Sequence, residues 1–119
     1  LPDDWKAMFE DVKIAPANAM PGVNYFKIRE WVRQCTRFER FNLMNNRPPV
    51  MGMDLVFCRN VLIYFEDPIK KAVQTMLARA MSPGGVMVLG ASVQMLVPEY
   101  FESRLGKGGP WYVRNDTRV

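Results

Sequence analysis

Three polar side chains near the middle of the sequence, Arg59, Asn60 and Tyr64, are of types that bind anions and polar ligands. They interrupt an otherwise apolar run, MDLVFCRNVLIYF, whose first part is predicted to form a buried strand over residues 53–58. In an open parallel sheet, ligands bind beyond the carboxyl ends of the strands. We therefore expect Arg59 and Asn60 to face a ligand. The alternative is that Arg59 caps backbone carbonyl groups or pairs with a nearby acid.

The residue types that are missing exclude several kinds of chemistry. The sequence contains no histidine and only two cysteines, Cys35 and Cys58. A zinc site, which usually needs about four Cys or His ligands, is not expected. Catalysis by a Ser-His or Cys-His pair is excluded for this chain. The two thiols are expected to be reduced and at least half-buried, as in a cytoplasmic protein.

Size and composition indicate a folded domain or part of one. The chain has 119 residues, 49 % of them hydrophobic, and no apolar run approaches the roughly 20 residues of a membrane span. Because the first residue is Leu1, we expect the natural chain to begin earlier. The net charge is +4, and five of the cations, Lys27, Arg29, Arg33, Arg37 and Arg40, lie close together in the sequence. A solvated basic face is the favoured interpretation, with nucleic-acid binding as an alternative.

The centre of the sequence is predicted to form a strand, a helix and a second strand. Asp67 is expected as the N-cap of the helix and Pro68 as its first residue, and the segment 82–85 should end it. A strand is expected over 86–90, which completes a βαβ unit. An apolar stripe along the helix should face the core: Ile69, Ala72, Val73, Met76, Leu77, Ala80 and Met81. Four polar residues are expected to face away from it: Lys70, Lys71, Gln74 and Arg79.

Shorter elements are predicted on either side of this unit. An initial helix should carry Trp5, Met8, Phe9 and Val12 at helical spacing, and residues 15–22 should form a loop. Further expected elements are an extended segment over 25–28, a short helix over 29–34, a strand over 36–41 and an antiparallel hairpin over 100–114. The predicted strand at 53–58 is apolar on both faces, which is typical of a strand covered by helices on both sides.

The segment from Asp54 to Phe65 resembles the signature of the CheR family of chemotaxis receptor methyltransferases, whose members carry a nearly identical Phe-Cys-Arg-Asn-Val-x-Ile-Tyr-Phe run. The turn at 82–85 is similar to the Pro-Gly-Gly segment of that family. Phe38 and the triplet Phe41-Asn42-Leu43 resemble its Phe-x-x-x-Asn-Leu segment. The resemblance covers essentially the whole chain.

The resemblance implies an α/β fold, the C-terminal half of a Rossmann-like class I methyltransferase domain, spanning residues 1–119. It implies an enzyme that uses S-adenosylmethionine, without a metal, to form methyl esters on glutamate side chains of chemoreceptors. Asn42 and Leu43 would lie against the adenosine, and Arg59 and Asn60 would contact the cofactor or shape its pocket. Tyr64 would face the methyl group and help to hold the glutamate carboxylate.

Two departures from the family pattern limit this inference. No segment of the sequence matches the Gly-containing cofactor loop of the family or its downstream acidic residue. Where the family usually has Gly-His-Ser-Glu, this chain has Gly90-Ala91-Ser92-Val93. We therefore expect these residues to be inactive or weakly active alone. Because the strand at 55–58 would have an open apolar edge, we also expect self-association or swapping of elements.

Three interpretations remain open at this stage. The first is the C-terminal part of a methyltransferase that acts on chemoreceptors, or a methyltransferase with a different substrate. The second is a degenerate, non-catalytic module that binds other proteins. The third is a nucleic-acid binder that uses the basic cluster, although no aromatic ladder is interleaved with these charges.

Overall fold

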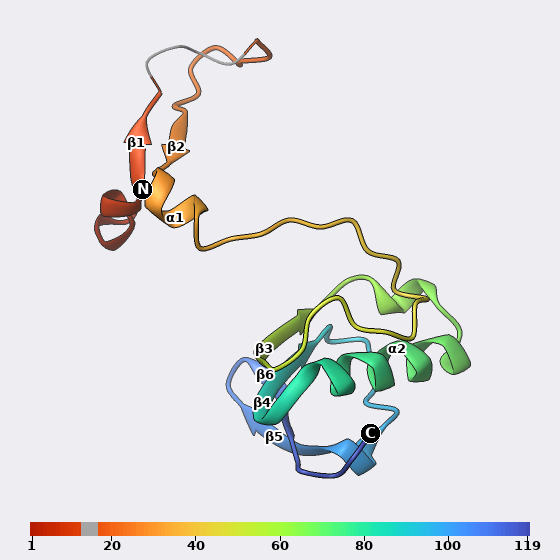
Figure 1. The fold of residues 1–119 in the computed structure, drawn as a ribbon. Coiled ribbons are helices and arrows are strands. Elements are labelled where there is room, and N and C mark those ends of the chain that lie inside the picture. Colours follow the sequence, from red (N-terminus) through yellow and green to blue (C-terminus); the bar gives the residue numbers. More distant parts are fainter. Residues whose placement is uncertain (13–16) are drawn as a thin grey trace. The chain divides into compact units, whose positions relative to one another are not determined.

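The computed structural model describes residues 1–12 and 17–119. These residues form two compact units, Leu1–Arg40 and Phe41–Val119 (Figure 1). The loop predicted over 15–22 lies partly outside the described residues, and its described part, 17–22, contains turns and no helix or strand.

The first unit is built around a short antiparallel pair of strands. The 3-10 helix η1, Asp3–Met8, leads directly into β1, Phe9–Asp11, and β1 pairs with β2, Phe26–Ile28. The extended segment predicted over 25–28 is therefore confirmed. The prediction that the initial helix continues through Phe9 is wrong, because Phe9 is extended and pairs with Ile28.

The end of this unit also departs from the sequence prediction. The short helix expected over 29–34 is confirmed as α1, Glu30–Arg33. The strand expected over 36–41 is absent, since residues 36–40 have no regular structure. Thr36 instead bonds back to the carbonyl of Arg33 through both its backbone N–H and its hydroxyl. With no partner strand among the described residues, Phe38 is left 96 % exposed.

The second unit contains a four-stranded mixed sheet and one long helix. The strands are β3, Met53–Cys58, β4, Met81–Leu89, β5, Phe101–Gly106, and β6, Gly109–Arg114, in the spatial order β3-β4-β6-β5. β3 and β4 are parallel, and β6 pairs antiparallel with both β4 and β5. The predicted strand-helix-strand unit and C-terminal hairpin are confirmed, and so is the α/β class.

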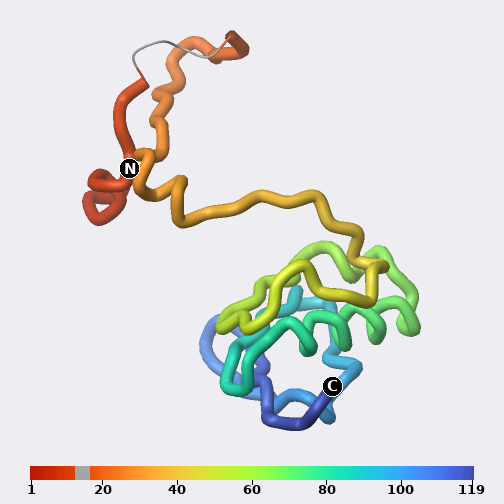
Figure 2. The backbone as a smooth tube through the Cα atoms, viewed as in Figure 1, coloured from red at the N-terminus to blue at the C-terminus, as the bar shows by residue number. Residues whose placement is uncertain are grey.

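The helix between the two parallel strands is α2, Asp67–Ala80, and Figure 2 shows the chain passing through it from β3 to β4. The helix begins one residue earlier than predicted, because the carbonyl of Glu66 accepts the first helical bonds from Ile69 and Lys70. It also ends earlier, at Ala80. Met81 is already the first residue of β4 and pairs with Met53, and an irregular register follows through Gly84, whose φ is +84°.

The two faces of the sheet differ in how they are covered. α2 packs on one face, where Cys58, Met87 and Leu89 belong to the core cluster. On the other face of β3, Leu55 is 49 % and Phe57 65 % exposed. Within the second unit, the expected helical cover on both faces of this strand is therefore wrong, because its residues cover one face. β3 is also an edge strand in this sheet.

The buried side of α2 is displaced around the helix from the predicted stripe. Ala72, which was expected in the core, is exposed, whereas Gln74, which was expected to face outward, has an exposed fraction of 0 %. Ala78 is also fully buried. The segment after β4 covers this side of the helix, because Gln74 forms hydrogen bonds with residues 94 and 96.

Candidate functional site

The carboxyl ends of the two parallel strands lie next to each other, as a ligand site at this edge requires. Arg59 and Asn60 directly follow Cys58 at the end of β3, and both are exposed. Gly90 follows the end of β4, and a Cβ added to it would lie 3.5 Å from the backbone nitrogen of Asn60. The two strand ends therefore meet at Asn60 and Gly90.

Asn60 adopts a backbone conformation that is uncommon for a residue with a side chain. Its φ is +61°, and it is the described non-glycine residue with positive φ. Asn tolerates this left-handed region better than most residues because its short polar side chain can bond locally. The chain therefore turns sharply at the end of β3.

The short 3-10 helix η2, Leu62–Tyr64, fixes the residues that follow the turn. Leu62 is fully buried and anchors this helix in the core, whereas Tyr64 is 80 % exposed. The carbonyl of Leu62 accepts a hydrogen bond from the backbone N–H of Phe65 at 3.0 Å. The buried anchor at Leu62 therefore leaves the phenol of Tyr64 at the surface.

Asn42 and Leu43 belong to a turn before β3. The side-chain oxygen of Asn42 accepts a hydrogen bond from the backbone N–H of Met44 at 3.0 Å, and its carbonyl accepts one from Asn45 at 2.9 Å. Leu43 is half-buried against the core cluster. The Nη1 of Arg79 donates to the carbonyl of Asn46 at 2.8 Å, which ties this turn to α2.

The structure thus places three of the five predicted site residues in one segment and the other two in a separate turn. Arg59, Asn60 and Tyr64 share one short connection between β3 and α2. Across residues 1–12 and 17–119, no hydrogen bond or ion pair links Asn42 or Leu43 to these three residues. Within the same residues, the guanidinium of Arg59 and the phenol of Tyr64 form no hydrogen bond, so their polar groups are available to a ligand.

The sequence patterns did not predict the burial of one polar residue of α2, Gln74. Gln74 was expected on the outer face of α2, yet its amide bonds to the segment that follows Gly90. A helical stripe predicts burial from apolar side chains and gives no signal for a buried amide.

The two thiols differ in environment. Cys58 is buried at the end of β3, and burial raises the pKa of its thiol. Cys35 is exposed, and its thiol donates to the carbonyl of Trp31 at 3.3 Å. The prediction that both thiols are at least half-buried is therefore wrong for Cys35, because no packed strand follows α1. The part of the chain that the structure describes contains no cluster of His, Cys, Asp and Glu suited to a metal ion.

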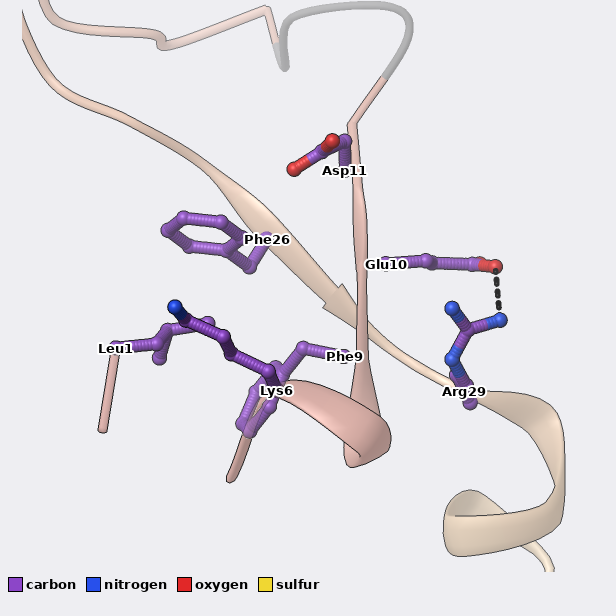
Figure 3. Close-up of a pocket in the computed structure, with 7 residues that line it drawn as sticks. All are labelled: Leu1, Lys6, Phe9, Glu10, Asp11, Phe26 and Arg29. Atoms are coloured by element: carbon purple, nitrogen blue, oxygen red, sulfur yellow. Dashed lines mark ion pairs between the residues drawn. The ribbon is translucent and has the colours of Figure 1, made fainter. Parts of the chain in front are cut away.

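A separate pocket of about 360 Å³ lies in the first unit. Figure 3 shows Phe9 and Phe26 on its apolar side and an ion pair between Glu10 and Arg29, whose atoms are 3.9 Å apart. Lys6, which also lines the pocket, pairs with Asp3 at 2.7 Å. Because two cationic side chains, Lys6 and Arg29, and two carboxylates, Glu10 and Asp11, line it together, the pocket does not favour a ligand of one charge.

The basic cluster is partly neutralised by neighbouring acids. Arg33 pairs with Glu30 and Arg37 pairs with Glu39. The hydrogen bond from Arg33, together with its charge, lowers the pKa of the Glu30 carboxyl. These local pairs favour the interpretation of the cluster as a solvated face over a nucleic-acid site, which needs cations free to contact phosphates.

No helix within residues 1–12 and 17–119 is both long enough and apolar enough to cross a bilayer.

A parallel strand pair with polar residues at its carboxyl edge is typical of nucleotide- and cofactor-binding α/β domains. The family model described as "CheR methyltransferase, SAM binding domain" matches residues 17–107. The chain therefore belongs to the CheR methyltransferase family and contains part of its S-adenosylmethionine-binding domain.

Curated relatives agree with this assignment. The chain is 36 % identical over 91 residues to a chemotaxis protein methyltransferase of Vibrio anguillarum, an alignment that covers 76 % of this chain and 30 % of the relative. It is 34 % identical over 91 residues to chemotaxis protein methyltransferase 1 of Vibrio cholerae, with the same coverage. It is 33 % identical over 85 residues to the probable biofilm formation methyltransferase WspC of Pseudomonas aeruginosa, covering 68 % of this chain and 20 % of that protein. The chain thus spans about a third or less of these relatives.

Proposed function

We propose that residues 1–119 form part of an S-adenosylmethionine-dependent methyltransferase that esterifies glutamate side chains of chemoreceptors. The observation that carries the proposal is the family match over residues 17–107, which includes the turn at the carboxyl end of β3. The names of the Vibrio relatives support a role in chemotaxis.

The residues at this edge fit one side of a site for S-adenosylmethionine. Arg59 and Asn60 offer a guanidinium and an amide at the end of β3, and we assign both to the cofactor pocket. Asn42 and Leu43 combine an amide with a half-buried apolar side chain, and we assign them to the adenosine. When bound, S-adenosylmethionine supplies an electrophilic methyl group on a positively charged sulfur.

The acceptor chemistry needs little from the protein beyond alignment. A glutamate carboxylate is already ionised at neutral pH, since its ordinary pKa is about 4.3, so no general base is required. The protein must orient this carboxylate and exclude water. We assign the orienting role to Tyr64, whose exposed phenol can donate a hydrogen bond to a carboxylate oxygen.

The experiment that tests this role uses the longest natural polypeptide that contains residues 1–119, the parent polypeptide. Tyr64→Phe removes one hydroxyl and leaves the ring. We expect the methyl-transfer rate to fall about tenfold or more, a loss of at least about 1.4 kcal/mol, while S-adenosylhomocysteine affinity changes less than about twofold. An unchanged rate with a glutamate-bearing receptor peptide would exclude the role.

The sequence Gly90-Ala91-Ser92-Val93 favours a second candidate function. It replaces the His and Glu that the family usually has beside Gly90, so contacts with the acceptor differ. The relative WspC, named for biofilm formation, is a family member whose name refers to another process. A methyltransferase with a different protein substrate, or a non-catalytic module that binds such a protein, is the alternative. Methyl transfer to a chemoreceptor supports the first function, transfer only to another protein supports a different substrate, and no transfer to any protein supports the non-catalytic module.

Three further properties follow from the proposal. We infer a cytoplasmic location, where receptor signalling domains and reduced thiols are found together. We also infer that the isolated 119-residue chain has little or no activity, because the sequence has no match to the cofactor loop of the family. The open edge and exposed face of β3 support self-association of the isolated chain.

A further inference from the structure

Gln74 is the most deeply buried polar side chain of α2. It lies near the middle of the helix, with an exposed fraction of 0 %. A primary amide has two donor hydrogens and an acceptor oxygen, and burying them without partners costs roughly as much as one or more lost hydrogen bonds. A residue of this type in a helix core therefore needs specific partners.

Both ends of the Gln74 amide have such partners, and both belong to the same segment. Its Nε2 donates to the carbonyl of Gln94 at 2.9 Å, and its Oε1 accepts from the backbone N–H of Leu96 at 2.8 Å. The two backbone groups are two residues apart, so a single side chain bonds to them as the edge of a neighbouring strand would. No side-chain polar atom is left buried without a partner in the described part of the chain.

The segment that Gln74 holds runs from Gly90 at the end of β4 to η3, Pro98–Tyr100. Val93 and Val97 of this segment are buried, and the N–H of Val93 bonds to the carbonyl of Gly90 at 3.0 Å. The first residue of the segment, Gly90, packs against Asn60. One end of the segment therefore touches the candidate site, and α2 fixes the other.

The sequence of this segment explains why an external anchor is needed. Residues 91 and 93 are Ala and Val, at positions where the family usually has the longer polar residues His and Glu. Ala91 and Val93 have no side-chain donor or acceptor with which to hold the backbone in one conformation. The backbone bonds to Gln74 supply this restraint from the helix.

We propose that Gln74 is a positioning residue that fixes segment 91–96, which continues from Gly90 beside Asn60, and so shapes the surface that the acceptor side chain meets. This inference rests on the proposed methyltransferase function. It assigns Gln74 no contact with the cofactor or the acceptor. Loss of its two hydrogen bonds should therefore change transfer to the acceptor and leave binding of S-adenosylhomocysteine nearly unchanged.

The test compares Gln74→Met with Val73→Ala. Met keeps the length of the side chain and removes both hydrogen bonds, whereas Val73→Ala creates a small cavity at a neighbouring buried position and leaves the Gln74 bonds intact. Hydrogen exchange of the Leu96 amide is measured in the 119-residue chain. We expect exchange about tenfold faster in Gln74→Met than in Val73→Ala, the factor for losing one or two net hydrogen bonds. Equal rates would overturn the proposal.

The second arm measures methyl transfer and S-adenosylhomocysteine binding in the parent polypeptide. We expect the kcat of Gln74→Met to fall about tenfold, with S-adenosylhomocysteine affinity within about twofold of the unaltered protein and Val73→Ala near full rate. If the unaltered protein transfers methyl groups and Gln74→Met does so at the same rate, the positioning role of Gln74 is overturned and the proposed function stands. Failure of the unaltered protein to transfer methyl groups overturns the proposed function.

Discussion

The two faces of β3 carry similar apolar residues in different surroundings. On one face, Val56 and Cys58 pack into the core formed with α2. On the other, Leu55 and Phe57 remain largely exposed, beside half-buried Val86 and Val88 of β4. Apolar residues on both faces show that the strand is suited to burial on both sides. The second unit therefore covers one face of β3, and the other face offers a surface for further chain or for a partner.

The largest expected effect is on stability and tests whether the two faces differ in energy. Met87→Ala, on the covered face, should lower the free energy of unfolding by about 2–5 kcal/mol, because it opens a cavity at a fully buried position. Phe57→Ala, on the exposed face, should cost less than about 1 kcal/mol. Urea unfolding of both variants checks this. Equal losses would mean that the exposed face is packed in solution.

The thiols give a second comparison, between the covered face and an exposed segment. Cys58 is buried, and burial raises the pKa of its thiol. Its thiolate therefore forms at higher pH than that of an exposed cysteine, and an alkylating reagent reaches it slowly. We expect alkylation of Cys35 to be at least about tenfold faster than alkylation of Cys58 at pH 8. Mass spectrometry of the labelled peptides, with Cys35→Ser as the control, measures both rates.

The same thiol predicts a pH dependence. A pKa raised by burial stabilises the folded chain while the thiol is protonated in both states. This contribution is lost as pH rises from the ordinary Cys value of about 8.5 toward the raised value in the folded chain. Cys58→Ala should therefore flatten the decline of stability above about pH 8.5. An unchanged decline would show that other groups cause it.

The exposed face of β3 also predicts weak self-association of the chain. Phe57→Lys places a charge beside Leu55 on the open edge strand, and such charges oppose edge-to-edge pairing. We expect the dissociation constant for self-association to rise about tenfold or more, equivalent to about 1.4 kcal/mol. Sedimentation velocity of the 119-residue chain measures this, with Phe38→Lys, at a more exposed position outside the sheet, as the control. A monomeric wild-type chain at high concentration would contradict the inferred association.

The central elements could be predicted because their signals are local. β3, the start of α2 and the C-terminal hairpin are marked by apolar runs, Pro68 and the glycines of the turn. The prediction of the initial helix is wrong at Phe9, because this residue pairs with Ile28 in a strand despite its helical spacing in the sequence. The prediction of a strand over 36–41 is wrong because alternating polar and apolar residues do not by themselves supply a partner strand.

The candidate site was predictable in part for the same reason. Arg59 and Asn60 could be placed because the end of a buried strand is visible in the sequence. The contact between Asn60 and Gly90 depends on the parallel pairing of β3 with β4. The burial of Gln74 could not be predicted, since it depends on a segment about 20 residues away folding over α2. The roles of Asn42, Leu43 and Tyr64 stay predictions.

Binding of S-adenosylhomocysteine measured by titration calorimetry tests the central claim most directly. We predict binding in a one-to-one ratio to the parent polypeptide, weakened about tenfold by Asn60→Ala, and no binding at micromolar concentration to the 119-residue chain alone. Lys107→Ala, in the exposed turn between β5 and β6 and outside the proposed pocket, serves as the control and should bind normally. Micromolar binding by the isolated chain, or normal binding by Asn60→Ala, would contradict the account.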